Sequence, residues 1–313
     1  MARKQQQHKD SAEKTAKQEE VDSKDTNGPE ETQGSKKRKQ PAPTDPNKQP
    51  RRSGRNAPKS EASPSSVLDF LLSSKALESC APADETEAIS KDENLRTYTN
   101  GTASLTPFEE LVSAVILSRP ISHRLGLRSI RTIFNAPYEF TSPKAIRDAG
   151  AEKRHQALWD AKTQHKQKTV EELELLAEAF DTDGQDQVGL DHIREEASQD
   201  IEKEREILKS RVKGLGATGL DIFCRRIQWL WPEAYPFVDK RTAASLEKLG
   251  LPSEGERLRN ALEEVWAEAK GNVEGKDEDE AKRKAFVIIL ERATGAELES
   301  KTDEVLAQAV QAD

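Results

Sequence analysis

Two glycines one residue apart, placed directly before an amphipathic segment, constrain the fold of this chain more than any other feature. Gly214 and Gly216 stand in the run Val-Lys-Gly-Leu-Gly-Ala-Thr-Gly, and because they carry no Cβ the backbone can turn sharply there and approach a bulky group. Apolar residues follow at spacings of three and four, which predicts a helix with one buried face: Leu220, Phe223, Cys224, Ile227, Leu230 and Trp231. Residues 193–208, before the glycines, are charged and free of Gly and Pro, so they also predict a helix.

The glycine loop is therefore expected at the N-terminus of a helix. Exposed backbone amides at such an end, together with the helix dipole, favour a bound phosphate, and Lys213 adds a positive charge. A Gly-x-Gly before a helix also occurs in dinucleotide-binding folds and in ordinary turns. A dinucleotide fold needs a strand before the glycines, and residues 193–208 do not predict one.

The expected order of elements is a helix, a glycine hairpin and a second helix, followed by Phe-Val-Asp ending at Asp239. This order resembles that of the helix-hairpin-helix DNA glycosylase superfamily, the group that includes endonuclease III. In that group the hairpin grips the DNA backbone, and a Val-Asp further along the chain supplies the catalytic carboxylate. The resemblance covers about residues 104–295 and is most specific over 208–242. It implies Asp239 as the catalytic residue and the following DNA-binding residues: Lys213, Gly214, Gly216, Thr218, Gly219, Lys240 and Arg241.

The resemblance extends upstream of the hairpin. Thr106-Pro107-Phe108-Glu109 has the form of a capping box with Pro at the first helical position, and the helix that it starts ends in Ile-Leu-Ser at Ser118, similar to the family's Leu-Leu-Ser. Family members often carry a polar residue two positions later, and here that residue is Pro120. Ser142-Pro143 then predicts a short helix that Gly150 ends.

Two departures from the family pattern bear on chemistry. The bifunctional members carry a Schiff-base lysine where this chain has Thr218, so the resemblance implies removal of a base through water, without strand cleavage. Asp239 would then stabilise the cationic sugar or orient the attacking water. Lys240-Arg241 follows it where many members have a His. The alternative for Asp239 is a helix N-cap alone, for which Asp is a preferred residue.

Cysteine usage excludes some cofactors. The chain has only Cys80 and Cys224, so neither the four-cysteine iron–sulfur cluster of some relatives nor a cysteine-based zinc site can form. We expect Cys224 in the core, Cys80 in a poorly structured region, and no disulfide between them, which suits a reducing compartment. The sequence predicts no cofactor and no metal site.

Composition predicts that part of the chain is not packed. Hydrophobic and charged residues each make up 34% of it, and residues 1–66 contain no Phe, Trp or Tyr, which predicts a disordered tail. We expect a poorly ordered linker with a short helix over 67–103, the main domain over 104–295, and a fraying tail over 296–313. No stretch alternates polar and apolar residues in the manner of a strand, so the predicted fold is all-α.

Two basic clusters in the tail resemble a bipartite nuclear localisation signal, although an ordinary charged tail would look similar. The clusters are Lys36, Lys37, Arg38 and Lys39, then Arg51 and Arg52. They predict a nuclear protein with an import receptor among its partners. No apolar run is long enough to span a bilayer and the N-terminus does not resemble a signal peptide, so we expect no membrane association, and we expect a monomer.

Charge is unevenly distributed. The chain carries a formal net charge of −8, yet residues 103–168 carry +5 and residues 211–250 carry +3, whereas residues 169–210 carry −10. The positive segments are those that the family uses to grip DNA. The arginines at 119, 124, 128 and 131 could line a DNA backbone or form a solvated helix face.

A group of aromatic residues lies between the hairpin helix and Asp239, where it could stack on an extruded base or pack in the core. The group is Trp229, Trp231, Tyr235 and Phe237. The leading hypothesis is a nuclear base excision repair protein, a monofunctional DNA glycosylase that binds double-stranded DNA. The second is a DNA-binding module of the same fold without chemistry. A helical adaptor for protein partners would leave the hairpin and the charge pattern unexplained.

Overall fold

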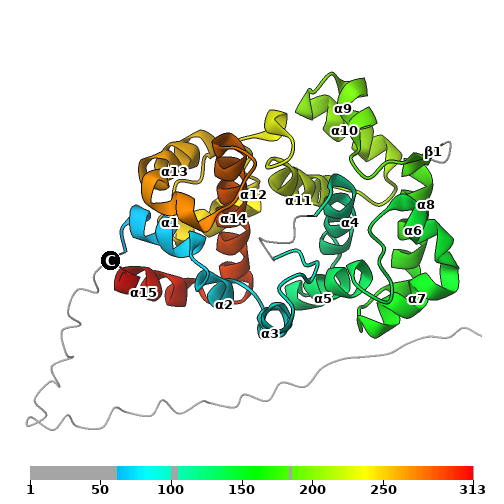
Figure 1. Cartoon of the computed structure of the whole chain (residues 1–313), viewed down its shortest axis with the longest axis horizontal. Helices are drawn as coiled ribbons and strands as arrows, with labels where there is room; N and C mark the ends of the chain where they lie inside the picture. Colours follow the sequence, from blue (N-terminus) through cyan, green and yellow to red (C-terminus); the bar gives the residue numbers. More distant parts are fainter. Residues whose placement is uncertain (1–61, 100–104, 183–184, 313) are drawn as a thin grey trace, which may run out of the picture. The chain divides into compact units, whose positions relative to one another are not determined.

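The computed structural model describes residues 62–99, 105–182 and 185–312, and these are helical over most of their length. The all-α prediction is confirmed, apart from one short antiparallel pair of strands with two residues each. In this pair β1 (Asp181–Thr182) lies beside β2 (Gln185–Asp186). The helices, shown in Figure 1, are α1 (Pro64–Leu72), α2 (Ala76–Cys80), α3 (Ala83–Lys91), α4 (Pro107–Leu117), α5 (His123–Phe134), α6 (Pro143–Asp148), α7 (Gly150–Asp160), α8 (Lys166–Phe180), α9 (Asp191–Ala197), α10 (Ile201–Arg211), α11 (Ala217–Ile227), η1 (Pro232–Ala234), α12 (Lys240–Lys248), α13 (Gly255–Ala269), η2 (Lys270–Asn272), α14 (Glu278–Leu298) and α15 (Thr302–Ala312).

Local start signals in the sequence are used as predicted at two helices. The Thr106 hydroxyl accepts from the Glu109 amide at 3.3 Å, and the Glu109 carboxylate accepts from the Thr106 amide at 2.7 Å, so α4 begins with a complete capping box. Ser142 caps α6 by accepting from the Ala145 amide at 3.1 Å. Such caps satisfy amides that have no partner within the helix, which is why these boundaries can be predicted from sequence.

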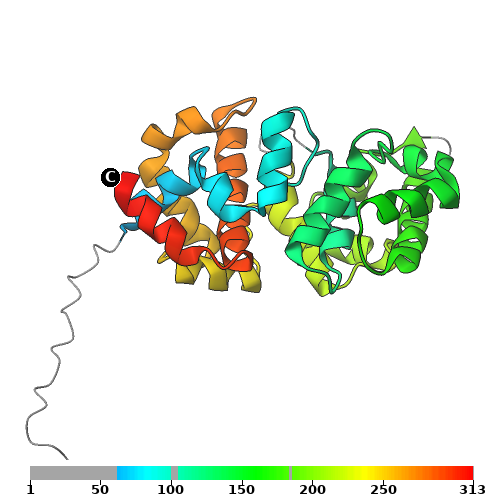
Figure 2. The same cartoon turned by 90° about the horizontal axis from the view of Figure 1, so that it is seen from below.

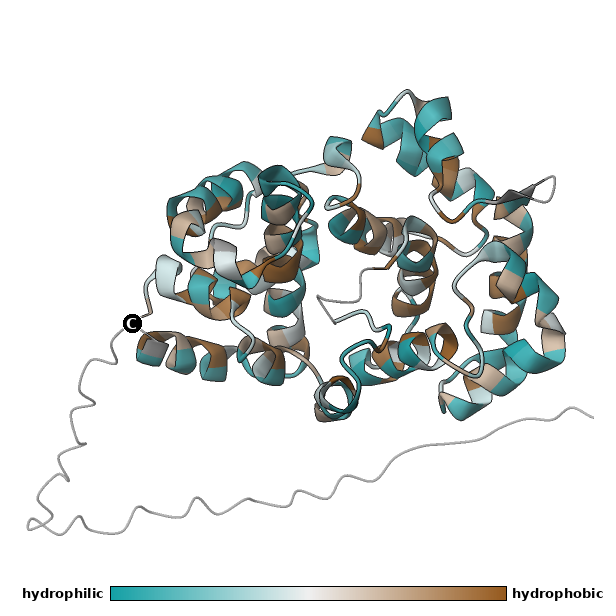
Figure 3. Cartoon of the chain, in the orientation of Figure 1, coloured by the Kyte–Doolittle hydropathy of each residue, from teal (hydrophilic) through white to brown (hydrophobic). Residues whose placement is uncertain are grey.

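Apolar side chains gather into two buried clusters. The first holds α4 to α11 together, with Phe108, Phe180 and Phe223 fully buried. The second is built from α1, α2 and α12 to α15 around Phe286. Figures 1 and 2 show the helices of each cluster gathered together, and Figure 3 shows that many helices carry hydrophobic residues on one side and hydrophilic residues on the other.

The segment 67–103 differs from the poorly ordered linker that we expected. It contains most of α1 and all of α2 and α3, and Val67, Leu68 and Leu71 are at most 1% exposed. These side chains bury against α13, α14 and α15, whose sequences lie far along the chain, so no local pattern could reveal the contact. The Arg292 guanidinium also donates to the Leu71 and Ser73 carbonyls and holds the end of α1.

The segment 296–313 is likewise not a fraying tail over its described part. It contains α15, in which Val305 and Ala309 are fully buried against the second cluster, and Glu304 accepts from the Ser79 hydroxyl at 2.8 Å. The helical domain therefore extends well beyond 104–295 on both sides. α15 buries one apolar face against α1 and α14. This burial stabilises a helix that is too short to persist alone.

The predicted tail falls mostly outside the described residues. The structure describes the chain from residue 62, and α1 begins at Pro64, two residues before the predicted end of the tail. Both basic clusters, at 36–39 and at 51–52, lie outside the described part. Of the helices that are described, none combines the length and the apolar character needed to cross a bilayer.

Candidate nucleic-acid interface

The glycine loop joins α10 to α11 as a tight hairpin. Asp200 caps the start of α10, with its carboxylate accepting from the Glu202 and Lys203 amides, and the helix ends at Arg211. Gly214 has a φ of +90°, a conformation that residues with a Cβ rarely adopt, and Gly216 is the N-cap of α11. A helix, a hairpin and a helix are therefore present, but the single helix predicted over 193–208 is divided into α9 and α10 by a break at residues 198–200.

The glycines at and near the hairpin differ in what a Cβ would contact. A Cβ on Gly214 would lie 2.8 Å from the Glu172 carboxyl group, whereas a Cβ on Gly216 would meet no atom within 4 Å. A Cβ on Gly219, on the first turn of α11, would lie 2.7 Å from the Leu215 side chain and in ordinary contact with Ser118, the C-cap of α4. Backbone conformation and packing thus require glycine at 214, whereas neither requires it at 216.

A buried ion pair lies next to the hairpin. Glu172 of α8 pairs with Arg119, which directly follows Ser118, and both side chains are at most 9% exposed. Burial lowers the pKa of the Arg119 guanidinium. Arg119 is therefore a structural partner of the hairpin region, and Pro120 beside it is exposed.

Three cations near the hairpin and the start of α12 point to solvent. Lys213, Lys240 and Arg241 are exposed, and in the described part of the chain none of them forms an ion pair. Gly214, Gly216 and Thr218 are exposed beside Lys213. Unpaired cations beside exposed helix-start amides match what a phosphate backbone requires.

The arginines of α5 have a role that neither sequence-based interpretation foresaw. Arg124 and Arg128 pair with Asp84 of α3 at 2.7 and 3.1 Å, and Arg131 pairs with Glu85, which is 1% exposed. These cations hold α3 on α5. They are not a free DNA-binding row, whereas the Arg124 side chain is 59% exposed and to that extent fits the solvated-face interpretation.

Asp239 is the N-cap of α12 and is nearly enclosed. Its Oδ1 accepts from the backbone amides of Arg241 and Thr242 at 3.0 and 3.1 Å. Its Oδ2 accepts from the Thr242 hydroxyl at 2.6 Å and from Arg225 at 3.0 Å. Burial works to raise the pKa of Asp239, but Arg225 and Thr242 outweigh it and hold that pKa below its usual value. The capping interpretation is therefore confirmed, and all four acceptor positions of the carboxylate are occupied.

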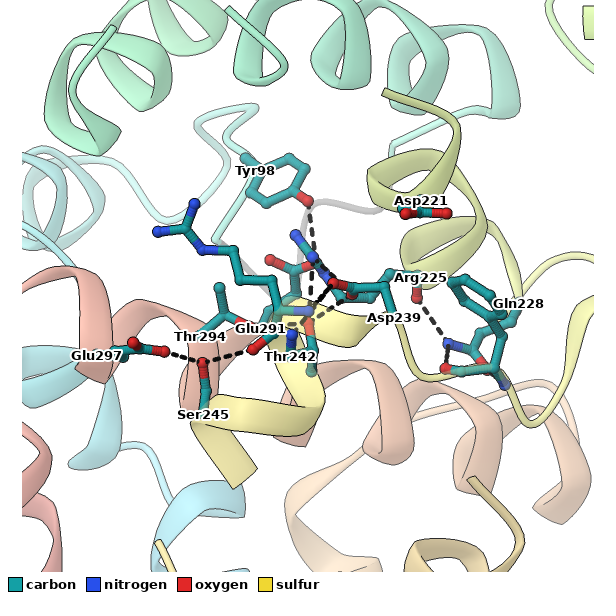
Figure 4. Close-up of polar contacts among 12 residues, drawn as sticks. Tyr98, Asp221, Arg225, Gln228, Asp239, Thr242, Ser245, Glu291, Thr294 and Glu297 are labelled. Carbon is teal, nitrogen blue, oxygen red and sulfur yellow. Dashed lines mark hydrogen bonds and ion pairs between the residues drawn. The ribbon is translucent and has the colours of Figure 1, made fainter. Parts of the chain in front are cut away.

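Arg225 links Asp239 to a second carboxylate (Figure 4). Its Nε donates to Glu291 Oε1 on α14 at 2.7 Å, and the Tyr98 hydroxyl donates to the same oxygen at 2.9 Å. One guanidinium thus serves two carboxylates. The group formed by Asp239, Arg225 and Glu291, which we call the acidic triad, carries a net charge of −1.

These side chains line a cleft of about 570 Å³. The lining includes the acidic triad together with the following residues: Tyr98, Leu117, Arg119, Ile121, His123, Thr218, Asp221, Ile222, Lys240, Arg241 and Thr294. The hairpin helix, the end of α4 and the start of α12 therefore meet at one site, hereafter the Asp239 cleft. Its volume lies within the roughly 300–1,000 Å³ usual for small-molecule sites.

The aromatic group between the hairpin helix and Asp239 belongs to the core. Trp231 is 1% exposed and lies edge-on to Phe223 at 5.3 Å, and Tyr235 lies against Phe286 at 5.1 Å. Trp229 is 8% exposed. The core interpretation of these residues is confirmed for Trp229 and Trp231, and the aromatic side chain in the cleft is Tyr98 instead.

Sequence reasoning missed several residues of the cleft. Tyr98 lies in the segment taken as a linker, and Glu291 is one of many acids on α14, so neither stands out by spacing. His123, whose Nδ1 lies 2.9 Å from Glu299, had no partner that could be recognised from sequence. The tertiary fold brings these residues together from distant segments.

The cysteines and potential metal ligands add little to the site. Cys80, buried in α2 rather than in a poorly structured region, and Cys224 in α11 are both free, and burial raises the pKa of the Cys80 thiol to about 12. Across the described residues, no three side chains of the metal-binding types come together. Comparisons of the chain with protein-family models, with curated proteins and with solved structures find no match.

Proposed function

We propose that this protein binds double-stranded DNA and removes a base from it by hydrolysis, as a helix-hairpin-helix DNA glycosylase without lyase activity. The observation that carries the proposal is the meeting of the hairpin helix, Lys240, Arg241 and Asp239 around one cleft. Segments that are separated in sequence thus bring the hairpin helix close to a cleft whose lining includes both cations and the carboxylates Asp239 and Glu291, which supports the proposal. A base extruded from the duplex would enter that cleft while the hairpin holds the backbone.

The binding half of the proposal rests on the exposed cations and amides. Lys213, Lys240 and Arg241 have no carboxylate partner among the described residues, so they can neutralise phosphates without first breaking an ion pair. Each phosphate contact that is lost should lower the salt dependence of binding by roughly one unit of slope.

The chemical half rests on charge. Departure of a base leaves positive charge on the sugar, and the acidic triad would stabilise that charge because its net charge is −1. Thr218 stands where the bifunctional members of the family carry their lysine, so the proposal takes water as the attacking group, without a covalent intermediate.

A second candidate function is favoured by the state of Asp239. Its four hydrogen bonds leave no acceptor position for water, and its pairing with Arg225 makes it a weak base. A DNA-binding module without chemistry is therefore the alternative, and it would use the same hairpin.

The test combines base release with binding. Duplexes with a panel of damaged or mismatched bases are incubated with excess protein, with alkali added afterwards, and binding is measured at two salt concentrations. Strand breaks only after alkali support a monofunctional glycosylase, whereas salt-sensitive binding without product supports the module. Lys240→Ala and Arg241→Ala should weaken binding, and the exposed Lys153→Ala, on α7 outside the cleft, serves as the matched control.

The proposed location is the nucleus. A fluorescent fusion of the full chain should accumulate there and lose that distribution when Lys36 to Lys39 are replaced by alanine. Retention in the nucleus by that variant would contradict the import signal.

A further inference from the structure

Glu291 is the carboxylate of the Asp239 cleft best placed to act on a reacting group. Three carboxylates line the cleft, and they differ in how their oxygens are used: Asp221, Asp239 and Glu291. Asp239 accepts four hydrogen bonds, two on each oxygen. Asp221 is paired singly with Arg205 at 2.8 Å and its side chain is 38% exposed, so its charge is both neutralised and screened by water.

Glu291 differs from both. Its Oε1 accepts from Arg225 Nε and from the Tyr98 hydroxyl, which fixes the plane and the position of the carboxylate. No group in the described part of the chain donates to its Oε2. Its side chain is 15% exposed, which makes it the more accessible of the two carboxylates that share Arg225, since Asp239 is 5% exposed.

The charge balance points to the same residue. Arg225 is held by Asp239 on one nitrogen and by Glu291 on another, so within the acidic triad one negative charge is in excess, while Lys240 and Arg241 line the same cleft. The hydrogen bonds from two amides, a hydroxyl and a guanidinium disperse the charge of Asp239. Among the carboxylate oxygens of Asp239 and Glu291, Glu291 Oε2 is therefore the one whose charge is least dispersed by donors.

We infer that Glu291 is the catalytic carboxylate of the proposed glycosylase and that Asp239 is a positioning residue that fixes Arg225 and the start of α12. This inference rests on the proposed function. The carbon–nitrogen bond between sugar and base breaks, and its electron pair leaves with the base. Water then attacks the positive anomeric carbon while Glu291 Oε2 takes the proton of that water and later releases it to solvent. The base nitrogen takes a proton from solvent, so the net reaction adds one water across the bond.

The inference can be tested before the natural substrate is known. The full chain is bound to two duplexes that differ at one nucleotide, one with a cationic pyrrolidine in place of the sugar and one with a neutral tetrahydrofuran. Wild type should prefer the cationic duplex by about tenfold, since a carboxylate oxygen without a donor in a partly desolvated cleft attracts a positive charge that lies close to it. Glu291→Gln should abolish this preference, because Gln keeps an acceptor for Arg225 and Tyr98 but has no charge.

The controls separate charge from fold. Asp239→Asn should lose less of the preference than Glu291→Gln, because Asn still caps α12 and Glu291 keeps its charge, even though both variants bring the net charge of the triad to zero. Glu278→Gln removes a carboxylate from the start of the same helix, where it pairs with Lys282 outside the cleft, and should change neither binding constant. Unfolding by urea, followed by circular dichroism, establishes that each variant is folded.

The outcomes separate the inference from the proposed function. Loss of the preference in Asp239→Asn but not in Glu291→Gln would overturn the inference and return the role to Asp239. Equal wild-type binding to both duplexes would overturn it while leaving DNA binding by the hairpin intact. Binding of neither duplex would refute the proposed function itself.

Discussion

Replacing the two hairpin glycines separately by alanine should give unequal losses of stability, and the structure sets the size of the difference. At Gly214 the φ of +90° costs a residue with a Cβ about 1–2 kcal/mol. The new methyl would also lie 2.8 Å from the Glu172 carboxyl group, which is held by Arg119 and must move, at a further cost of about 1 kcal/mol. We expect Gly214→Ala to lower the free energy of unfolding by about 2–3 kcal/mol.

At Gly216 two small effects oppose each other. Alanine is a poorer N-cap than glycine by about 0.5 kcal/mol, but it reduces the entropy of the unfolded chain, which favours folding by about 0.4–1 kcal/mol. The methyl meets no atom within 4 Å, so Gly216→Ala should leave stability unchanged within about 0.5 kcal/mol. Because that variant stays folded, any loss of DNA affinity reports on the approach of phosphate to the hairpin.

The assay is urea unfolding followed by circular dichroism, with DNA affinity measured by fluorescence anisotropy on the same preparations. For a domain of this size, the loss in Gly214→Ala corresponds to a fall of about 4–12 °C in melting temperature. Equal stabilities of the two variants would refute the reasoning from backbone conformation. Unchanged DNA binding by Gly216→Ala would refute close approach of the backbone at that residue.

Three other outcomes are expected. Gly295→Ala should destabilise the protein by about 3 kcal/mol or more, because its Cβ would overlap the Cys80 carbonyl oxygen; a melting temperature equal to that of wild type would contradict the packing of α2 on α14. Burial, followed by repulsion from Glu233, raises the pKa of Glu204 from its usual 4.5 to about 7. The folded state therefore binds the Glu204 proton more tightly than the unfolded state does. The protein loses stability as pH rises from about 4.5 to 7. Glu204→Gln should therefore gain stability over wild type by about 1–2 kcal/mol between pH 5 and pH 8 in urea unfolding, and a difference independent of pH would count against this. Deleting residues 302–313 should lower the urea concentration at the unfolding midpoint, since α15 buries Val305 and Ala309. An unchanged midpoint would support the fraying tail that the sequence predicted.

Several parts of the fold follow from short-range signals. The capping box at Thr106, the cap at Ser142 and the glycine hairpin were predicted, and each depends on residues within about one helical turn of one another. Local chemistry determines these elements, so a single sequence suffices to predict them.

The same chemistry does not identify the partners of an amphipathic segment. Val67, Leu68 and Leu71 form an apolar face, but their neighbours lie on α13, α14 and α15, so the sequence made α1 look like part of a linker. Arg124 and its neighbours on α5 looked free until α3 supplied their carboxylates. Ion pairs and burial between distant segments depend on the packing of the whole domain.

The candidate site divides in the same way. The sequence by itself determined the hairpin, the cations beside it and the capping position of Asp239, because each belongs to one short stretch of chain. Only the tertiary structure decided how Asp239 is used, since Arg225 reaches it across 14 residues and joins it to Glu291, 66 residues beyond Arg225. Whether a carboxylate can act on a ligand depends on which hydrogen bonds its oxygens already accept, and those donors are placed by folding.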